Sequence, residues 1–263
     1  MSGYDVSSPG NEQVKRLVRL QQRRHRDEER LFVVEEPRVI MRALQSGHVP
    51  VDTYICPDVG PETFDLPHRT MSREAIDKAS YRRASTGIIS LFPYFETSLG
   101  GLHSLEDRPG DPLLLIVEGM EKPGNLGALL RIADGAGVDG VILVEPAADL
   151  FNPNTVRSST GCLFTVPIAT ADFTSAAGWL SDHDIRSVAA SPEASSTYWE
   201  ADLSGPCAVW VGAEATGLSG DAIDNARETV SVPMRGAADS LNTSVAAALI
   251  VYEAVRQRCQ GAV

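Results

Sequence analysis

The chain has 263 residues, of which 43% are hydrophobic and 22% charged, an ordinary globular composition that excludes disordered, collagen-like and coiled-coil classes. Its length predicts one large domain or two modest ones. No apolar run reaches the ~18 residues that a membrane span needs, and the first residues lack the apolar core of a signal peptide. The cysteines form no CxxC pair, which argues against a disulfide scaffold and a zinc site and predicts a cytoplasmic protein without metal. They are Cys56, Cys162, Cys207 and Cys259.

Charge is unevenly distributed along the sequence. The net charge is −12, yet residues 1–100 contain 14 basic and 14 acidic side chains, whereas residues 101–263 contain 9 and 21. Residues 15–26 contain six basic side chains and no acidic one. Because the local field matters more than the total charge, the first part can bind a polyanion despite the acidic total.

The first hundred residues predict a small α/β domain. Residues 11–30 carry Val14, Leu17 and Val18 at helical spacing and predict one continuous helix. Five arginines of this stretch recur with the helical period and are expected on one face: Arg16, Arg19, Arg23, Arg26 and Arg30. That face is either an RNA-binding surface or a solvated helix surface. The next predicted elements are strands at 31–34, 51–56 and 87–92 and helices at 37–45 and 72–80.

The second part alternates strands with helices. Residues 97–112 are rich in Gly, Pro and acid and predict a linker. The predicted strands then lie at 113–120, 140–146, 163–168, 185–190, 207–212 and 229–234. The predicted helices lie at 125–137, 153–160, 172–181 and 240–258. This alternation indicates a parallel α/β sheet, with domains at 1–100 and 113–263 and a linker at 101–112.

Three segments of this second part have the composition of a functional site. In residues 118–131 a strand runs through a Pro-Gly-Asn turn into a helix, whose first N–H groups can bind an anion; a plain strand-to-helix turn is the alternative. In residues 210–220 a strand ends in a glycine loop that carries Glu214, at the strand end where open α/β sheets bind ligands; a solvated connection is the alternative. In residues 230–248 a strand ends at a proline before Ser240 and Asn242, which could equally cap the next helix.

Together and in this order, the segments resemble the SpoU (TrmH) branch of the SPOUT methyltransferases. The first motif of that family is matched by Asn125, Gly127 and Arg131. The second motif is matched by Gly212, Glu214, Gly217 and Leu218. The third motif is matched by Val232, Pro233, Met234, Ser240, Leu241 and Asn242. A weaker resemblance extends over residues 32–44, 85–90 and 152–168.

The resemblance implies a SPOUT methyltransferase domain at 113–263 with a deep trefoil knot, preceded by a small ribosomal-protein-like domain that binds RNA. It implies a homodimer that transfers a methyl group from S-adenosylmethionine to a ribose 2′-hydroxyl of RNA. The residues implied to bind S-adenosylmethionine are Gly212, Val232, Leu241, Met234, Gly217 and Leu218. Those implied to be catalytic are Arg131, Asn125, Glu214, Ser240 and Asn242.

Arg131 carries the implied chemistry. A ribose 2′-hydroxyl is a poor nucleophile at neutral pH and needs a base or a strong polar partner. Because a guanidinium has a pKa above ~12, Arg131 is better suited to orient the ribose and its phosphate than to remove a proton. The side chains of Asn125, Glu214, Ser240 and Asn242 are expected to hold this arginine and the loops.

The RNA partner is expected to be ribosomal, because short tRNA-modifying relatives mostly lack the N-terminal domain. Arg157, beside hydroxyls and a glycine, is a further candidate for RNA binding. The alternatives are a tRNA methyltransferase and a catalytically silent RNA-binding module. Housekeeping modification and antibiotic resistance are both compatible with the sequence.

Overall fold

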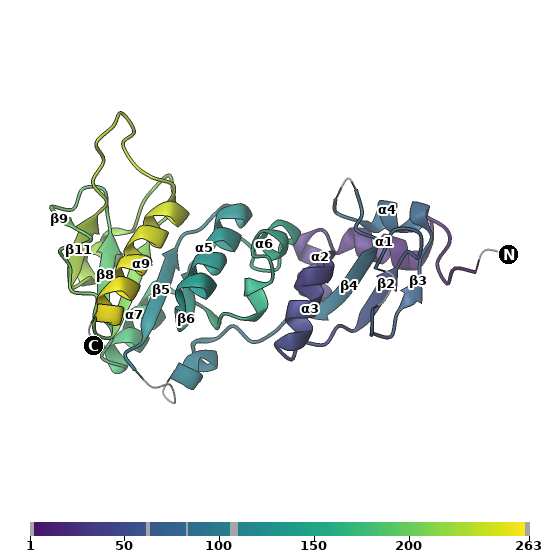
Figure 1. Ribbon diagram of the computed structural model, residues 1–263, viewed down its shortest axis with the longest axis horizontal. Coiled ribbons are helices and arrows are strands. Elements are labelled where there is room, and N and C mark those ends of the chain that lie inside the picture. Colours follow the sequence, from purple (N-terminus) through teal and green to yellow (C-terminus); the bar gives the residue numbers. More distant parts are fainter. Residues whose placement is uncertain (1–2, 62–63, 83, 106–109, 261–263) are drawn as a thin grey trace. The chain divides into compact units, whose positions relative to one another are not determined.

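The computed structural model describes residues 3–61, 64–82, 84–105 and 110–260 (Figure 1). The chain forms two compact units: the N-terminal unit comprises Met1–Phe95 and Asp149–Thr165, and the C-terminal unit comprises Glu96–Ala148 and Val166–Val263. Residues 149–165 therefore belong with the N-terminal unit although they follow half of the C-terminal sheet along the chain. The domain boundaries given above stay a prediction.

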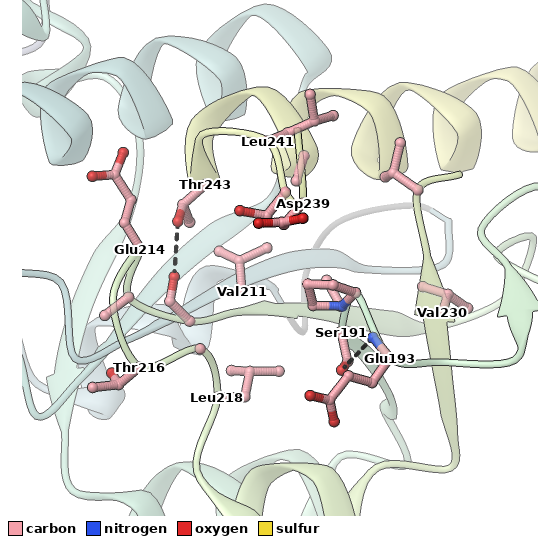
Figure 2. Close-up of a pocket in the computed structure, with 18 of the residues that line it drawn as sticks. Ser191, Glu193, Val211, Glu214, Thr216, Leu218, Val230, Asp239, Leu241 and Thr243 are labelled. Carbon is pink, nitrogen blue, oxygen red and sulfur yellow. Dashed lines mark hydrogen bonds between the residues drawn. The ribbon is translucent and has the colours of Figure 1, made fainter. Parts of the chain in front are cut away.

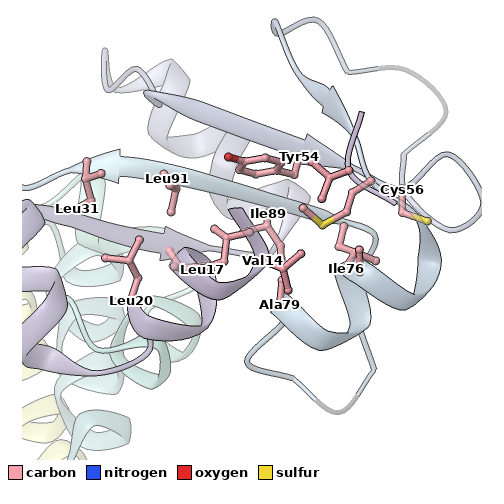
Figure 3. Packing of buried hydrophobic residues seen from close by; sticks show 14 residues of the cluster. Val14, Leu17, Leu20, Leu31, Tyr54, Cys56, Ile76, Ala79, Ile89 and Leu91 are labelled. Atoms are coloured by element: carbon pink, nitrogen blue, oxygen red, sulfur yellow. The ribbon is translucent and has the colours of Figure 1, made fainter. Parts of the chain in front are cut away.

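The N-terminal unit is a mixed four-stranded sheet with helices. Its strands are β1 (Leu31–Val34), β2 (Asp52–Ile55), β3 (Arg69–Thr70) and β4 (Ile88–Pro93), in the order β1-β4-β2-β3. Strand β4 is antiparallel to β1 and β2, and β2 is parallel to β3. The helices of the first 95 residues are α1 (Glu12–Arg19), α2 (Arg23–Glu29), α3 (Pro37–Gln45) and α4 (Arg73–Ala79). Val14 and Leu17 of α1, Ile76 of α4 and Tyr54 of β2 lie in one buried apolar cluster (Figure 3), which confirms a small α/β domain.

The single helix predicted over 11–30 is wrong. Helix α1 ends at Arg19, Gln22 is extended (φ −97°, ψ 136°), and α2 then begins at Arg23. The break lets Leu20 pack in the apolar cluster and turns Arg26 into the interior, where its side chain is 1% exposed. The Arg26 guanidinium donates to the carbonyl of Leu20 (2.8 Å) and pairs with Asp149. The arginines of this stretch therefore do not share one exposed face, and Arg26 is buried in an ion pair.

Residues 149–165 are fixed to the N-terminal unit by aromatic packing. They contain α6 (Pro153–Ser158) and the 3₁₀ turn η2 (Cys162–Phe164). The rings of Phe151 and Phe164 lie 4.8 and 5.9 Å from that of Phe32, and Tyr94 stacks on Phe151 at 3.9 Å. The strand predicted at 163–168 is wrong in its first part because Phe164 is buried among these rings; the strand begins at Ile168 instead.

The C-terminal unit is a seven-stranded sheet in the order β7-β6-β5-β10-β8-β11-β9, with every neighbouring pair parallel. Its strands are β5 (Leu113–Glu118), β6 (Gly140–Val144), β7 (Ile168–Ala171), β8 (Arg186–Ala190), β9 (Ser196–Thr197), β10 (Cys207–Val211) and β11 (Glu228–Ser231). Its α-helices are α5 (Pro123–Ala136), α7 (Phe173–Asp182), α8 (Gly220–Asn225) and α9 (Thr243–Gln260). The parallel α/β prediction is confirmed. The trefoil knot stays a prediction.

Some details of the C-terminal unit differ from the prediction. The predicted linker contains a 3₁₀ helix, η1 (Leu99–Leu105), whose Leu102 is fully buried in the core of the unit. Strand β9 and helix α8 were not predicted, because each is only a few residues long. None of the described helices has the length and apolar character required to cross a bilayer.

We predict that Arg26→Ala lowers the free energy of unfolding by about 3–5 kcal/mol, because it leaves the carboxylate of Asp149 largely buried and unpaired. The matched control is Arg23→Ala, whose side chain is 61% exposed and pairs with Asp27 on its own helix; its effect is expected within about 0.5 kcal/mol. Denaturant unfolding measures both. Equal losses for the two variants would contradict the assignment of Arg26 as an interior anchor.

Candidate functional site

A cavity of about 360 Å³ lies where three strands of the C-terminal sheet end. It is lined by residues that follow β8, β10 and β11 and by the start of α9 (Figure 2). This is the strand edge at which open α/β sheets bind ligands, and the volume falls within the usual range for small-molecule pockets. All six residues predicted to bind the cofactor line the cavity: Gly212, Val232, Leu241, Met234, Gly217 and Leu218.

The glycines of the loop after β10 are required by its geometry. A Cβ atom on Gly212 would lie 2.1 Å from the carbonyl carbon of Gly217 and 2.4 Å from the nitrogen of Leu218. The backbone of residues 217–218 can therefore approach position 212 this closely only if that residue has no side chain. Gly217 has a φ of +69° and donates its N–H to the carbonyl of Ala213 (2.9 Å). A positive φ is readily adopted by glycine and strained for most other residues. The two glycines therefore form this wall of the cavity.

A polar network joins this loop to two other segments through Glu214. The carboxylate of Glu214 pairs with Lys122, the residue before α5, and accepts a hydrogen bond from the side-chain amide of Asn125 (2.9 Å) in the first turn of α5. It also accepts from the amide of Asn242, which precedes α9. The hydrogen bond from Lys122, followed by that from Asn125, lowers the pKa of Glu214 below its ordinary value. The acid of the second motif is thus held as a carboxylate.

Asn242 has both roles that the sequence left open. Its side-chain oxygen accepts from the N–H (3.0 Å) and hydroxyl (2.6 Å) of Ser244, which caps the first turn of α9, while its amide donates to Glu214. The next residue, Thr243, donates its hydroxyl to the carbonyl of Gly212 (3.1 Å). The start of α9 is therefore bonded directly to the glycine loop.

The predicted cage around Arg131 is not found. Arg131 is exposed on α5, does not line the cavity, and makes no hydrogen bond or ion pair with the described part of the chain. Asn125, Glu214 and Asn242 bond to one another instead, and Ser240 is an exposed residue of the cavity wall. The Glu214 carboxylate, which could accept from a guanidinium, is instead bonded to Lys122, Asn125 and Asn242, and the catalytic roles of these residues stay a prediction.

Several residues of the site were missed by the sequence analysis. Glu193 and Asp239 line the cavity and bring carboxylates to it, which suits a ligand that carries positive charge. Glu118 accepts from the N–H (2.8 Å) and hydroxyl (2.7 Å) of Ser219, the N-cap of α8, and so fixes the far end of the glycine loop. An acid at the end of a buried strand was the available signal for Glu118. No such pattern marks Glu193 or Asp239.

The arginines predicted to bind RNA lie in the N-terminal unit. Arg16 pairs with Glu29 (2.6 Å) and Asp52 (3.4 Å), and Arg23 pairs with Asp27 (3.5 Å). Arg19 and Arg157 are exposed. Among the described residues there is no group of His, Cys, Asp or Glu side chains suited to hold a metal ion.

Comparison with known proteins identifies relatives of both units. The model of the SpoU rRNA Methylase family matches residues 112–252, and that of the MRM3-like substrate binding domain matches residues 11–90. The 23S rRNA (guanosine-2′-O-)-methyltransferase RlmB of Pectobacterium atrosepticum is 34% identical over 192 residues, covering 71% of this chain and 78% of that protein.

Solved structures resemble nearly the whole chain. The crystal structure of an RNA 2′-O ribose methyltransferase has a TM-score of 0.84 at 39% identity, covering 97% of this chain and 99% of that one. The SpoU methyltransferase AviRb from Streptomyces viridochromogenes, in complex with the cofactor AdoMet, has a TM-score of 0.84 at 26% identity, covering 95% and 98%.

We predict that Gly212→Ala destabilises the protein by about 1–3 kcal/mol, the usual cost of overpacking, because the added methyl group meets backbone atoms. Gly220→Ala is the matched control from the same region, since a Cβ there has nothing within 4 Å and its φ is not positive. Denaturant unfolding gives the energies, and amide exchange of residues 213–218 reports whether the loop opens. Unchanged stability and exchange in Gly212→Ala would refute the close approach.

Proposed function

The chain belongs to the SpoU rRNA methylase family, and on that premise we propose that it transfers a methyl group from S-adenosylmethionine to the 2′-hydroxyl of a guanosine in 23S rRNA. One observation carries the proposal: the six residues expected to bind the cofactor line a single cavity beside the Glu214 network. The guanosine target follows the activity of the RlmB relatives, which are 23S rRNA (guanosine-2′-O-)-methyltransferases.

The residues of the cavity fit S-adenosylmethionine. The loops after β10 and β11 offer backbone groups and apolar side chains, of which Val232 and Leu241 line the wall, and Glu193 and Asp239 offer carboxylates to its positive charges. When bound, S-adenosylmethionine supplies an electrophilic methyl group on a sulfonium. Gly212 and Gly217 keep that wall free of side chains.

The chain's own residues position the nucleophile. Arg131 is exposed and has no acidic partner in the described residues, so its guanidinium is available to a ribose and its phosphate. The Glu214 network fixes the turn at the start of α5, the helix that carries Arg131. In-line placement of the ribose hydroxyl lowers the barrier by removing orientational freedom. We assign Arg131 to orientation rather than to proton removal, because a guanidinium offers hydrogen-bond donors in a fixed fork and has no acceptor for a proton.

A catalytically silent RNA-binding module is the second candidate. The presence of all the polar motif residues argues against it, and among them Asn125 and Asn242 both donate to Glu214. A tRNA substrate is disfavoured by the match of residues 11–90 to a substrate-binding domain and by the rRNA activity of the relatives. The geometry favours the active rRNA enzyme.

The function is tested by mapping 2′-O-methylated riboses on rRNA from cells with and without this protein. We expect one guanosine of 23S rRNA to lose its methyl group in the deletion and to regain it with the wild-type chain. Restoration on tRNA alone, or no change at any ribose together with no S-adenosylmethionine binding by calorimetry, would refute the proposal.

We predict that Arg131→Lys slows single-turnover methyl transfer at least about tenfold, because a point charge cannot make the paired hydrogen bonds of a guanidinium. The affinity for S-adenosylmethionine is expected to stay unchanged, since Arg131 does not line the cavity. A rate within about threefold of wild type would remove Arg131 from the mechanism.

We further propose that the protein acts as a homodimer in the cytoplasm. The exposed side of α9 carries Val245, Leu249 and Tyr252, which are 47%, 37% and 49% exposed and recur at i, i+4 and i+7. A Cβ on Gly135 of α5 would lie 3.1 Å from the Tyr252 hydroxyl, and Arg131 lies one turn before Gly135. Association through this face would bring Arg131 to the interface.

We predict that Leu249→Asp converts a dimer to a monomer in sedimentation velocity and lowers methyl transfer, because a carboxylate in an apolar interface is left desolvated. The control is Val49→Asp, at a 67% exposed apolar residue of the N-terminal unit, which is expected to leave the mass unchanged. A wild-type chain that is monomeric at micromolar concentration would end the proposal.

A further inference from the structure

Most cations of the N-terminal unit are already neutralised by acids. Eight of its basic side chains form ion pairs with carboxylates: Lys15, Arg16, Arg23, Arg24, Arg26, Arg69, Arg73 and Arg82. The partners lie within the same unit, so an RNA phosphate would have to displace a carboxylate at each of these sites. The arginine-rich stretch 15–26 is therefore less available to RNA than its sequence indicates.

Three cations without an acidic partner in the described residues lie on α3 and α6, two helices that Arg42 connects through Thr160. Arg38 and Arg42 are exposed and stand at i and i+4 of α3, which places them on one helix face. Arg157 is exposed on α6. The other such cations, Arg19, Arg30 and Lys78, are scattered over α1, the end of α2 and α4.

Arg42 links α3 to the end of α6. Its guanidinium donates to the carbonyl of Thr160 (3.0 Å), a neutral acceptor that leaves the positive charge uncompensated. Its side chain crosses Gly161, where a Cβ would lie 2.8 Å from the Arg42 Cδ atom. Thr160 has a φ of +51°, which is uncommon for a β-branched residue. The loop after α6 therefore accommodates Arg42 and restricts its side chain. This restriction reduces the conformational entropy that the side chain loses when a ligand binds.

Arg157 lies at a small hollow between α6 and α3. The hollow is lined by Arg157, Val156, Val39, Tyr81 and Arg82, among others. Arg157 donates to the side chain of Asn154 (3.3 Å), which in turn donates to the hydroxyl of Tyr81 (2.9 Å). These contacts are neutral, so the charge of Arg157 is also uncompensated.

Two acids also line this hollow, and only Glu36 has a cationic partner among the described residues. Glu36 pairs with Arg82, and Glu35 accepts from the hydroxyl of Ser80 (2.7 Å) and the N–H of Tyr81 (2.6 Å). Arg82 and Arg157 balance these two carboxylates at the hollow, so the net positive charge of the two helices comes from Arg38 and Arg42, which do not line it. A row of uncompensated guanidinium groups suits the phosphates of a nucleic-acid backbone.

We propose that the N-terminal unit binds RNA phosphates through Arg38, Arg42 and Arg157, the α3–α6 face, rather than through the arginines of residues 15–26. The inference rests on the proposed function, because it names the surface that holds the rRNA substrate. It also gives residues 149–165 a role in substrate binding, although they are separated in sequence from the rest of the N-terminal unit.

The test measures how the affinity for an unmodified 23S rRNA transcript depends on salt. Each phosphate contact contributes about 0.7–0.9 to the slope of log K against log salt. The triple variant Arg38→Gln/Arg42→Gln/Arg157→Gln is therefore expected to lower the slope by about 2. The matched control Lys15→Gln/Arg24→Gln/Arg73→Gln removes the same charge from exposed residues, each paired with an acid on its own helix, and is expected to change the slope by less than about 0.5.

Two further variants separate charge from folding. Arg42→Lys keeps the charge and loses the guanidinium geometry, so the slope is expected to stay within about 0.5 of wild type. Arg19→Gln/Arg23→Gln tests the competing surface of residues 15–26. A larger slope loss in this double variant than in the triple variant, or equal losses in the triple variant and its control, would overturn the proposal.

The outcome also separates this inference from the function on which it rests. If the wild-type chain methylates the transcript and the triple variant keeps the wild-type slope, the proposal of the α3–α6 face is overturned and the proposed function stands. Wild-type chain that binds S-adenosylmethionine but neither binds nor methylates the transcript would overturn both.

Discussion

The geometry of the cavity depends on one carboxylate, that of Glu214. It joins the loop after β10 to the start of α5 through Lys122 and Asn125, and to the start of α9 through Asn242. Only the ionised acid can accept all these hydrogen bonds. Because the donors lower the pKa of Glu214, the network stabilises the fold above the ordinary pKa of a glutamate and is lost as the pH falls through the lowered value. At neutral pH the three segments are therefore held together.

Sequence predicts this site well where residue type follows from backbone geometry. Gly212 and Gly217 can be identified because a close backbone approach and a positive φ leave few alternatives to glycine. Their loop and the third motif follow strands of one parallel sheet, so they meet at the same edge. Glu193 and Asp239 could not be predicted, because no pattern in the sequence shows that the loops after β8 and β11 bring their side chains to the cavity. The prediction for Arg131 shows a further limit. The motifs identify Asn125, Glu214 and Asn242, but they do not show that these side chains bond to one another.

The N-terminal unit shows where periodicity fails. The arginines of residues 15–26 have a helical period, but the period carries no information about a break at Gln22 or about the carboxylate of Asp149 more than a hundred residues later. Burial of Arg26 depends on that distant acid, and burial of Phe32 depends on Phe151 and Phe164. Such contacts are set by the packing of residues 149–165, which neither composition nor spacing can indicate.

The charges of the two units differ in a way that favours RNA on the N-terminal unit and the methyl donor on the C-terminal unit. The C-terminal unit contains 8 basic and 21 acidic residues, whereas the N-terminal unit contains 15 and 14. Carboxylates such as Glu193 and Asp239 favour a cationic ligand in the cavity and repel a polyanion at the same surface. RNA held only by the C-terminal unit would meet this repulsion at each phosphate. Cations without acidic partners on the N-terminal unit, together with the exposed Arg131 of the first motif, allow RNA to bind while the acids remain available to the methyl donor.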